Sequence, residues 1–190
     1  MNTEESIGII EQMITAAKEE LSDDGFLYLL WGYLVLVASS LEFFLLGFEI
    51  TDLHFMPWPI LMTAGGIVSG IYIGRKNRQA RVKTFTDNLM AYLWGGLFVC
   101  ILLALFSLGA KNMWHIAYPV VMILYGIGTF VSGGVLKFRP LIFGGLVCWI
   151  GAAVSFHIEF YYQLPILAAV ILLAYIIPGH ILMTKFKRNV

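Results

Sequence analysis

The sequence predicts an all-α membrane protein, in which a polytopic bundle of six transmembrane helices follows an amphipathic N-terminal helix. Of the 190 residues, 59% are hydrophobic and only 13% are charged, whereas about a quarter of the residues in a soluble domain are charged. The hydrophobic residues also gather into six runs, and a spanning helix needs about 20 apolar residues. Because lipid cannot satisfy open backbone groups, each run is expected to be helical.

The six predicted spans divide the chain into two regions. An acidic N-terminal segment covers residues 1–24, and the transmembrane domain covers residues 25–190. The predicted spans are residues 26–48, 57–74, 89–109, 117–136, 141–157 and 164–184. The connecting segments are short, so no soluble catalytic domain is expected.

Basic residues predict the orientation of these spans. Eleven of the twelve Lys and Arg residues lie in the two termini, the second-to-third loop and the fourth-to-fifth loop, and Lys111 alone lies on the other side. Loops rich in Lys and Arg face the cytoplasm, so both termini are predicted to be cytoplasmic. The densest group is a basic loop that contains Arg75, Lys76, Arg78, Arg81 and Lys83.

Similar residues recur in alternate spans and suggest three tandem helical hairpins. Odd spans share an aromatic residue followed by glycine, and even spans share a small or breaking tripeptide that ends in glycine. The odd set is Trp31-Gly32, Trp94-Gly95 and Phe143-Gly144, and the even set is Val68-Ser69-Gly70, Val131-Ser132-Gly133 and Ile177-Pro178-Gly179. The alternative is chance similarity, since membrane sequences draw on few residue types and internal symmetry in such proteins is usually weak.

Two runs and the acidic N-terminal helix carry a resemblance to a known group of proteins. The runs are Tyr28-Leu29-Leu30-Trp31-Gly32 and Tyr125-Gly126-Ile127-Gly128-Thr129-Phe130-Val131-Ser132-Gly133-Gly134. With these features the chain resembles an uncharacterised family of small six-span bacterial inner-membrane proteins. The resemblance implies the fold and the bacterial inner membrane, and it implies no activity.

The N-terminal segment is predicted to be a surface helix. Apolar residues recur at steps of three and four and form one stripe. The stripe consists of Ile7, Ile10, Ile14, Ala17 and Leu21. The polar face is acidic, and the inner leaflet is negative, so a protein surface suits this helix better than lipid. It is predicted either to cover the basic loop of its own chain or to dock on a partner or second subunit.

Two polar residues within the spans are candidates for function. Glu42 is the one acid well inside a span, and a charge there must be paired, protonated or hydrated. It is predicted to carry protons or bind substrate, or else to reach water near the outer surface with Lys111 or an outer histidine. His180 follows Pro178, which frees a backbone carbonyl. His180 is therefore interpreted either as part of a hydrated kink in the helix or as an interfacial residue that extends its ring toward water.

The remaining candidates are weaker. Three outer histidines, His54, His115 and His157, could hold zinc or copper, but they lack ligand spacing, so neither a metal nor another cofactor is predicted. Gly66, Gly70 and Gly74 form a small-residue ridge that is expected to pack against another helix of the bundle, with a dimer contact as the alternative. Aromatic residues that include Trp58 and Tyr118 are assigned to an outer interfacial belt.

Three function classes follow. A non-enzymatic accessory, sensory or regulatory subunit that acts through a protein partner fits best, because buried polar residues are few. A small transporter or channel, proton-coupled through Glu42, is the alternative. An intramembrane serine protease would need Ser69 or Ser132 beside His180, but no catalytic motif is present, so no enzyme is predicted. The lipid bilayer and a protein partner or second copy are the expected partners, and nucleic acid is not.

Overall fold

The computed structural model describes residues 25–50, 52–79 and 85–189, and every regular element in these ranges is helical. The predicted all-α class is therefore confirmed. In chain order the elements are α2 (Phe26–Gly47), α3 (Pro57–Gln79), α4 (Phe85–Ala110), a 3-10 turn η1 (Trp114–Ile116), α5 (Ala117–Val135), α6 (Arg139–Ser155), α7 (Phe160–Ile171), a π-helical segment η2 (Leu172–Ile176) and α8 (Ile177–Asn189).

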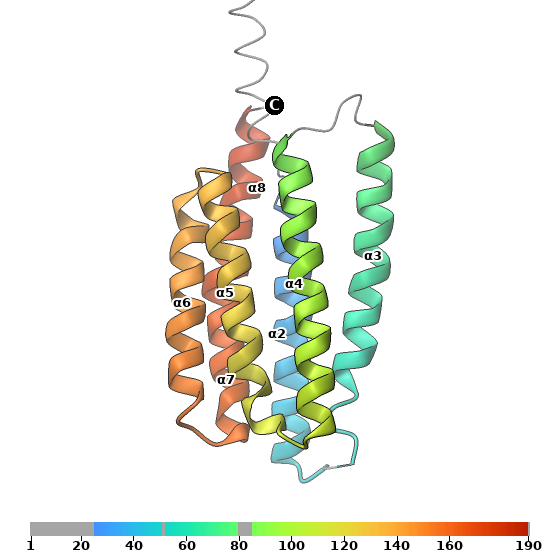
Figure 1. The fold of residues 1–190 in the computed structure, drawn as a ribbon, viewed down its shortest axis with the longest axis vertical. Coiled ribbons are helices and arrows are strands. Elements are labelled where there is room, and N and C mark those ends of the chain that lie inside the picture. Colours follow the sequence, from blue (N-terminus) through green and yellow to red (C-terminus); the bar gives the residue numbers. More distant parts are fainter. Residues whose placement is uncertain (1–24, 51, 80–84, 190) are drawn as a thin grey trace, which may run out of the picture.

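The helices run alternately up and down in one bundle (Figure 1). The α5–α6 turn, the end of α3 and the end of α8 lie together at the top of this view. Basic side chains gather at this end, which we call the basic end: Arg75, Lys76, Arg78, Lys137, Arg139, Lys185 and Lys187. Among the described side chains, Lys111 alone adds a Lys or Arg charge at the opposite end.

Four of the helices are long and apolar enough to cross a membrane. They are Phe26–Gly47, Phe85–Ala110, Trp114–Val135 and Phe160–Lys187. Helices also occupy the other two predicted spans, but α6 has only 17 residues. Glycines and a basic last turn make α3 less apolar. The structure thus supports a membrane protein with four candidate spans. Helices α3 and α6 fall short of the length or the hydropathy that defines these four.

Close backbone contacts define the core of the bundle. The most extensive pairing joins α5 to α6. A Cβ atom added to Gly133 would lie 2.6 Å from the backbone nitrogen of Ile142, and one added to Gly145 would lie 2.9 Å from the carbonyl oxygen of Gly126. Small residues allow helices to approach this closely. The other main contacts join α2 to α7 and to α3, and α4 to α5.

The predicted arrangement of three hairpins is not confirmed. The closest pair, α5 and α6, would belong to two different hairpins of the repeat. Repeat-related glycines also differ in their surroundings: Gly32 packs on η2 and Gly144 on Ala174, whereas no described atom lies within 4 Å of a Cβ added to Gly95. The local sequence similarity therefore does not extend to equivalent packing.

Three helices end in the same hydrogen-bonded turn, with a non-glycine residue in the left-handed region. The residues are Glu49 (φ 60°), Asn112 (φ 54°) and Lys137 (φ 49°). After α5, the N–H of Lys137 donates to the carbonyl of Gly134, and the N–H of Phe138 donates to that of Gly133. This is the Schellman pattern, which usually has glycine at the left-handed position. Glu49 and Lys137 thus adopt a backbone that costs an L residue free energy.

The last long helix changes its winding before Pro178. Residues Leu172–Ile176 form a π-helical segment, a common feature near a helix irregularity. Ala174, whose carbonyl the proline leaves without its usual donor, is fully buried, and its oxygen would lie 2.7 Å from a Cβ at Gly144. Close packing against α6 thus borders the freed carbonyl, and the interpretation of this segment as a hydrated kink stays a prediction.

Candidate functional site

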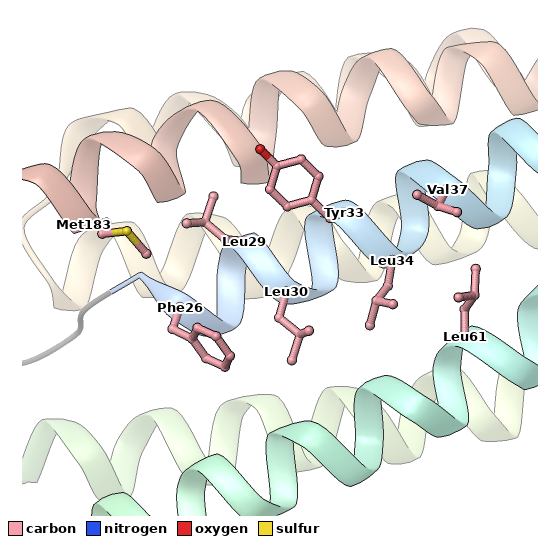
Figure 2. A pocket seen from close by; sticks show the side chains of 8 residues that line it. All are labelled: Phe26, Leu29, Leu30, Tyr33, Leu34, Val37, Leu61 and Met183. Carbon is pink, nitrogen blue, oxygen red and sulfur yellow. The ribbon is translucent and has the colours of Figure 1, made fainter.

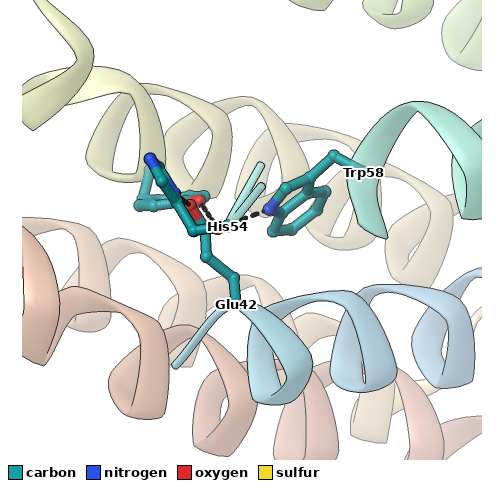
Figure 3. Close-up of polar contacts among 4 residues, drawn as sticks. Glu42, His54 and Trp58 are labelled. Atoms are coloured by element: carbon teal, nitrogen blue, oxygen red, sulfur yellow. Dashed lines mark hydrogen bonds and ion pairs between the residues drawn. The ribbon is translucent and has the colours of Figure 1, made fainter. Parts of the chain in front are cut away.

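The strongest polar cluster lies at the end of the bundle opposite the basic end, around the buried acid Glu42. Glu42 is 1% exposed. One of its carboxylate oxygens lies 2.8 Å from Nδ1 of His54, and the other accepts a hydrogen bond from Nε1 of Trp58 at 2.6 Å. Tyr118 donates its hydroxyl hydrogen to that second oxygen. We call these four residues the Glu42 cluster (Figure 3).

Four segments bring the cluster together. Glu42 lies near the end of α2, and His54 lies in the connection that follows it. Trp58 belongs to the first turn of α3, where Pro57 needs no helical hydrogen bond. Tyr118 belongs to the first turn of α5. The cluster thus ties the α2–α3 connection to α5, although the backbones of α3 and α5 do not pack closely on each other.

Aromatic rings enclose this carboxylate. The ring centroids of Trp58 and Tyr118 are 5.6 Å apart, and Tyr118 stacks on Phe160 of α7 at 5.3 Å. The ring of His54 lies edge-on to Phe160 at 6.4 Å. These rings exclude water from the carboxylate, which strengthens its remaining polar contacts.

The cluster supplies the polar partners that the buried carboxyl group of Glu42 needs. Trp58 and Tyr118 donate hydrogen bonds to one of its oxygens, and Nδ1 of His54 lies within hydrogen-bond distance of the other. His54 has 26% of its side chain exposed, and Trp58 and Tyr118 are also partly exposed. The sequence allowed Lys111 or an outer histidine as the partner, and the structure selects His54. The expectation that Glu42 itself reaches water is wrong, because its side chain is enclosed.

Two members of the cluster were assigned to another role by the sequence. Trp58 and Tyr118 were interpreted as interfacial belt residues, but each donates a hydrogen bond to Glu42. Both begin their helices one residue from a proline, at a depth close to that of Glu42. This depth was the one sign in the sequence that they could contact Glu42. Whether they lie beside Glu42 depends on how α2, α3 and α5 are arranged.

A buried amide fastens the loops near this cluster, in a role that no sequence pattern indicated. The Nε2 atom of Gln163, a 2% exposed residue, lies 2.8 Å from the carbonyl oxygen of His115, 3.1 Å from that of Ser155 and 3.2 Å from that of Ile158. These contacts tie η1 and the α6–α7 connection to α7. They satisfy backbone carbonyls that would be costly to bury unpaired.

The other histidines do not join Glu42. Among the described residues, no group of three His, Cys, Asp or Glu side chains is placed to hold a metal ion. His54 faces Glu42, and the contact made by His115 uses its backbone carbonyl. The structure therefore does not gather His54, His115 and His157 into the metal site considered from the sequence.

His180 lies at the basic end and contacts α2. Its Nε2 atom is hydrogen-bonded to the hydroxyl of Tyr33 at 2.9 Å, and the two rings meet edge-on with centroids 6.1 Å apart. Ser69 and Ser132 are buried on other helices, and neither forms the hydrogen bond to His180 that a protease would require. The exposed ring of His180 fits the interfacial interpretation.

An apolar hollow lies beside this contact, between α2, α3 and α8. Its volume is about 380 Å³. Figure 2 shows its lining, which consists of Phe26, Leu29, Leu30, Tyr33, Leu34, Val37, Leu61 and Met183. The hydroxyl of Tyr33 is its one polar side-chain group and is already bonded to His180, so the hollow offers no chemistry.

The small-residue ridge of α3 does not pack as expected. No described atom lies within 4 Å of a Cβ added to Gly66, Gly70 or Gly74. Gly65 is instead the glycine that faces α2, since a Cβ there would collide with Leu34 and lie 3.5 Å from Trp31. Packing of the ridge inside the bundle is therefore not found in the described part of the chain, and the dimer interpretation stays a prediction.

Two predicted features fall outside the described residues. The docking stripe of Ile7, Ile10, Ile14, Ala17 and Leu21 lies in residues 1–24, and Arg81 and Lys83 lie in residues 80–84. Comparisons with known proteins give no further information on these residues. No known protein family, curated protein or solved structure matches the chain.

Proposed function

We propose that this chain is a six-span protein of the bacterial inner membrane, with both termini in the cytoplasm, that acts without catalysis as an accessory, sensory or regulatory subunit of a protein partner. In this proposal α3 and α6 cross the membrane together with the four more apolar helices. The concentration of Lys and Arg at one end of the bundle supports the orientation.

The state of Glu42 is the observation that carries this proposal. An acid that carries protons or substrate through a membrane must exchange its partners with a water-filled path. Glu42 is instead 1% exposed, accepts hydrogen bonds from Trp58 and Tyr118, and contacts Nδ1 of His54. This pattern suits a structural clamp that fixes the α2–α3 connection to α5. Such a fixed contact is more typical of a protein that acts by binding a protein partner than of one that moves ions or substrates across the membrane.

Complementary charge supports a role through contacts. Residues 1–24 hold seven acids and Lys18, whereas the described part of the basic end holds seven Lys and Arg side chains. The predicted stripe, which includes Ile10 and Ile14, would provide an apolar seam if that acidic segment forms a helix. A partner that binds this seam would be drawn close to the basic end of the bundle.

A pull-down of the full chain from native membranes in mild detergent tests this proposal. We expect a stoichiometric partner with the unchanged chain and a loss of at least tenfold in that partner when Ile10 and Ile14 are both aspartate, because a charge in the seam must be desolvated on binding. The amount of captured partner, measured by quantitative mass spectrometry, is the readout.

The matched control places the same two charges opposite the stripe on the helix that the sequence predicts, as Gln12→Asp and Thr15→Asp. Partner capture should persist with this control. Equal loss in the two variants would show that added charge alone explains the result, and full retention in both would rule out the seam as the contact.

A second function, proton-coupled transport, draws on one specific observation. His54 is 26% exposed and lies 2.8 Å from Glu42, so it could pass protons between outer water and the carboxylate. In this case Glu42→Gln should abolish proton flux in liposomes that contain the purified chain, because an amide cannot take up the proton. The control is Glu159→Gln at the same end, whose side chain is exposed. Unchanged flux in the Glu42→Gln variant would eliminate the role of Glu42 in transport.

A further inference from the structure

A basic hollow lies where the α5–α6 turn meets α8, at the basic end of the bundle. Its volume is about 630 Å³. The lining residues are Lys137, Phe138, Arg139, Pro140, His180, Ile181, Thr184 and Lys185. Three of the eight are Lys or Arg, and none is Asp or Glu. We infer that this hollow binds the phosphate headgroup of an anionic phospholipid.

The cations of the hollow are held in place by the fold. The Nζ atom of Lys185 lies 5.7 Å from the ring centroid of Phe138, which is 5% exposed, and an ammonium over an aromatic face is attracted to it. Arg139 is the first residue of α6, so the positive end of that helix dipole adds to the attraction that its side chain offers an anion. His180 is fixed from behind by Tyr33. A phosphate in the hollow would meet charges that are already positioned.

The backbone at Lys137 is consistent with a function for this turn. Lys137 has a φ of 49° and occupies the left-handed position that ends α5. Glycine would fit that position with less strain. Strained non-glycine residues are enriched at functional sites, but Glu49 and Asn112 end their helices in the same way, so the strain supports a site here only together with the basic lining of the hollow.

The apolar surface beside the hollow suits a lipid rather than a free anion. Leu173, Ile177 and Ile181 are each between 43% and 49% exposed and follow one another at four-residue steps toward Lys185. In a membrane this face of η2 and α8 contacts acyl chains, and the hollow lies at the end of the stripe where a headgroup would be. Basic pockets between helices at a membrane surface are typical sites for such headgroups.

Native mass spectrometry of the full chain with added phosphatidylglycerol tests the inference. We expect phosphatidylglycerol to bind at least tenfold more tightly than phosphatidylcholine. Arg139→Gln and Lys185→Gln should each weaken it about fivefold, the effect typical of one basic residue at a lipid surface. The charge-matched control is Lys111→Gln at the opposite end, which should change the affinity by less than about twofold. Equal weakening by Lys111→Gln, or no preference over phosphatidylcholine, would overturn the inference.

A glycine variant separates binding from folding. Lys137→Gly should weaken phosphatidylglycerol binding about fivefold without lowering the thermal midpoint, because it removes both the charge and the left-handed strain. Asn112→Gly makes the same backbone change at the opposite end and should leave binding unchanged. If Lys137→Gly binds normally, Lys137 has no part in the site and the inference loses its argument from strain.

Two further arms distinguish other sources of negative charge. Inorganic phosphate at millimolar concentration should not displace phosphatidylglycerol; displacement would identify a site for free phosphate. A full-length variant with glutamine at the five N-terminal glutamates, Glu4, Glu5, Glu11, Glu19 and Glu20, should bind the lipid within about twofold of the unchanged chain. A tenfold gain would mean that the acidic segment occupies the hollow, and the lipid assignment would be wrong.

Discussion

Replacing Glu42 with alanine should lower the free energy of unfolding by about 2–6 kcal/mol, since each of two donors left without an acceptor in an enclosed space costs about 1–3 kcal/mol. Alanine leaves the donors of Trp58 and Tyr118 without an acceptor in an enclosed space. Reversible unfolding in mixed micelles, followed by circular dichroism, measures the change. Glu42→Gln should cost less, because one acceptor oxygen remains.

Two comparisons make this result specific to the Glu42 cluster. Glu159→Ala removes an exposed acid at the same end and should change the free energy of unfolding by less than about 0.5 kcal/mol. In the double variant Glu42→Ala and Tyr118→Phe, part of the lost stability should return, because the hydroxyl left without a partner is also removed. A Glu42→Ala variant as stable as Glu159→Ala would show that the cluster is not a clamp.

Gly144→Ala should destabilise the bundle by about 1–3 kcal/mol, the usual cost of overpacking a closely packed contact. An added Cβ would lie 2.7 Å from the carbonyl oxygen of Ala174 and 2.9 Å from its Cα. These are backbone atoms of the π-helical segment, so no rotamer change relieves the collision. The unfolding assay used for Glu42 provides the measurement, and a shift of the η2 winding should accompany the loss.

Gly95→Ala is the control for this substitution, because the repeat makes Gly95 the counterpart of Gly144. No described atom lies within 4 Å of a Cβ at Gly95, and alanine favours helix over glycine by up to about 1 kcal/mol. The Gly95→Ala variant should therefore be as stable as the unchanged chain or more stable. Similar losses at the two positions would indicate that the bundle packs with threefold symmetry after all.

The positions of the helices could be predicted from the sequence to within a few residues. The first predicted span, residues 26–48, corresponds to α2 at Phe26–Gly47, and the fourth, residues 117–136, corresponds to α5 at Ala117–Val135. Apolar length and the flanking polar residues carry this information, because a helix in lipid must satisfy its own backbone. The direction of each helix follows from the alternation along the chain.

The face that each helix turns toward its neighbours was not predictable. Gly65 and Gly66 are adjacent in a glycine-rich run, but only Gly65 packs on α2. Successive residues point about 100° apart around a helix, and in a membrane apolar residues suit both the lipid and the interior. Hydrophobicity therefore does not distinguish the packed face from the exposed one, as it does in a soluble protein.

The candidate site, like the fold, has features that the sequence predicted and features that depend on the tertiary structure. The sequence by itself determined that Glu42 lies within an apolar span near one end and that it needs a partner, because lipid makes an isolated charge costly. It also determined the gathering of basic residues at the other end. Only the tertiary structure decided that His54, Trp58 and Tyr118 are the partners, and that the α5–α6 turn and α8 share one hollow. Depth in the membrane is encoded along the chain, whereas contact between distant segments depends on how the helices pack around one another.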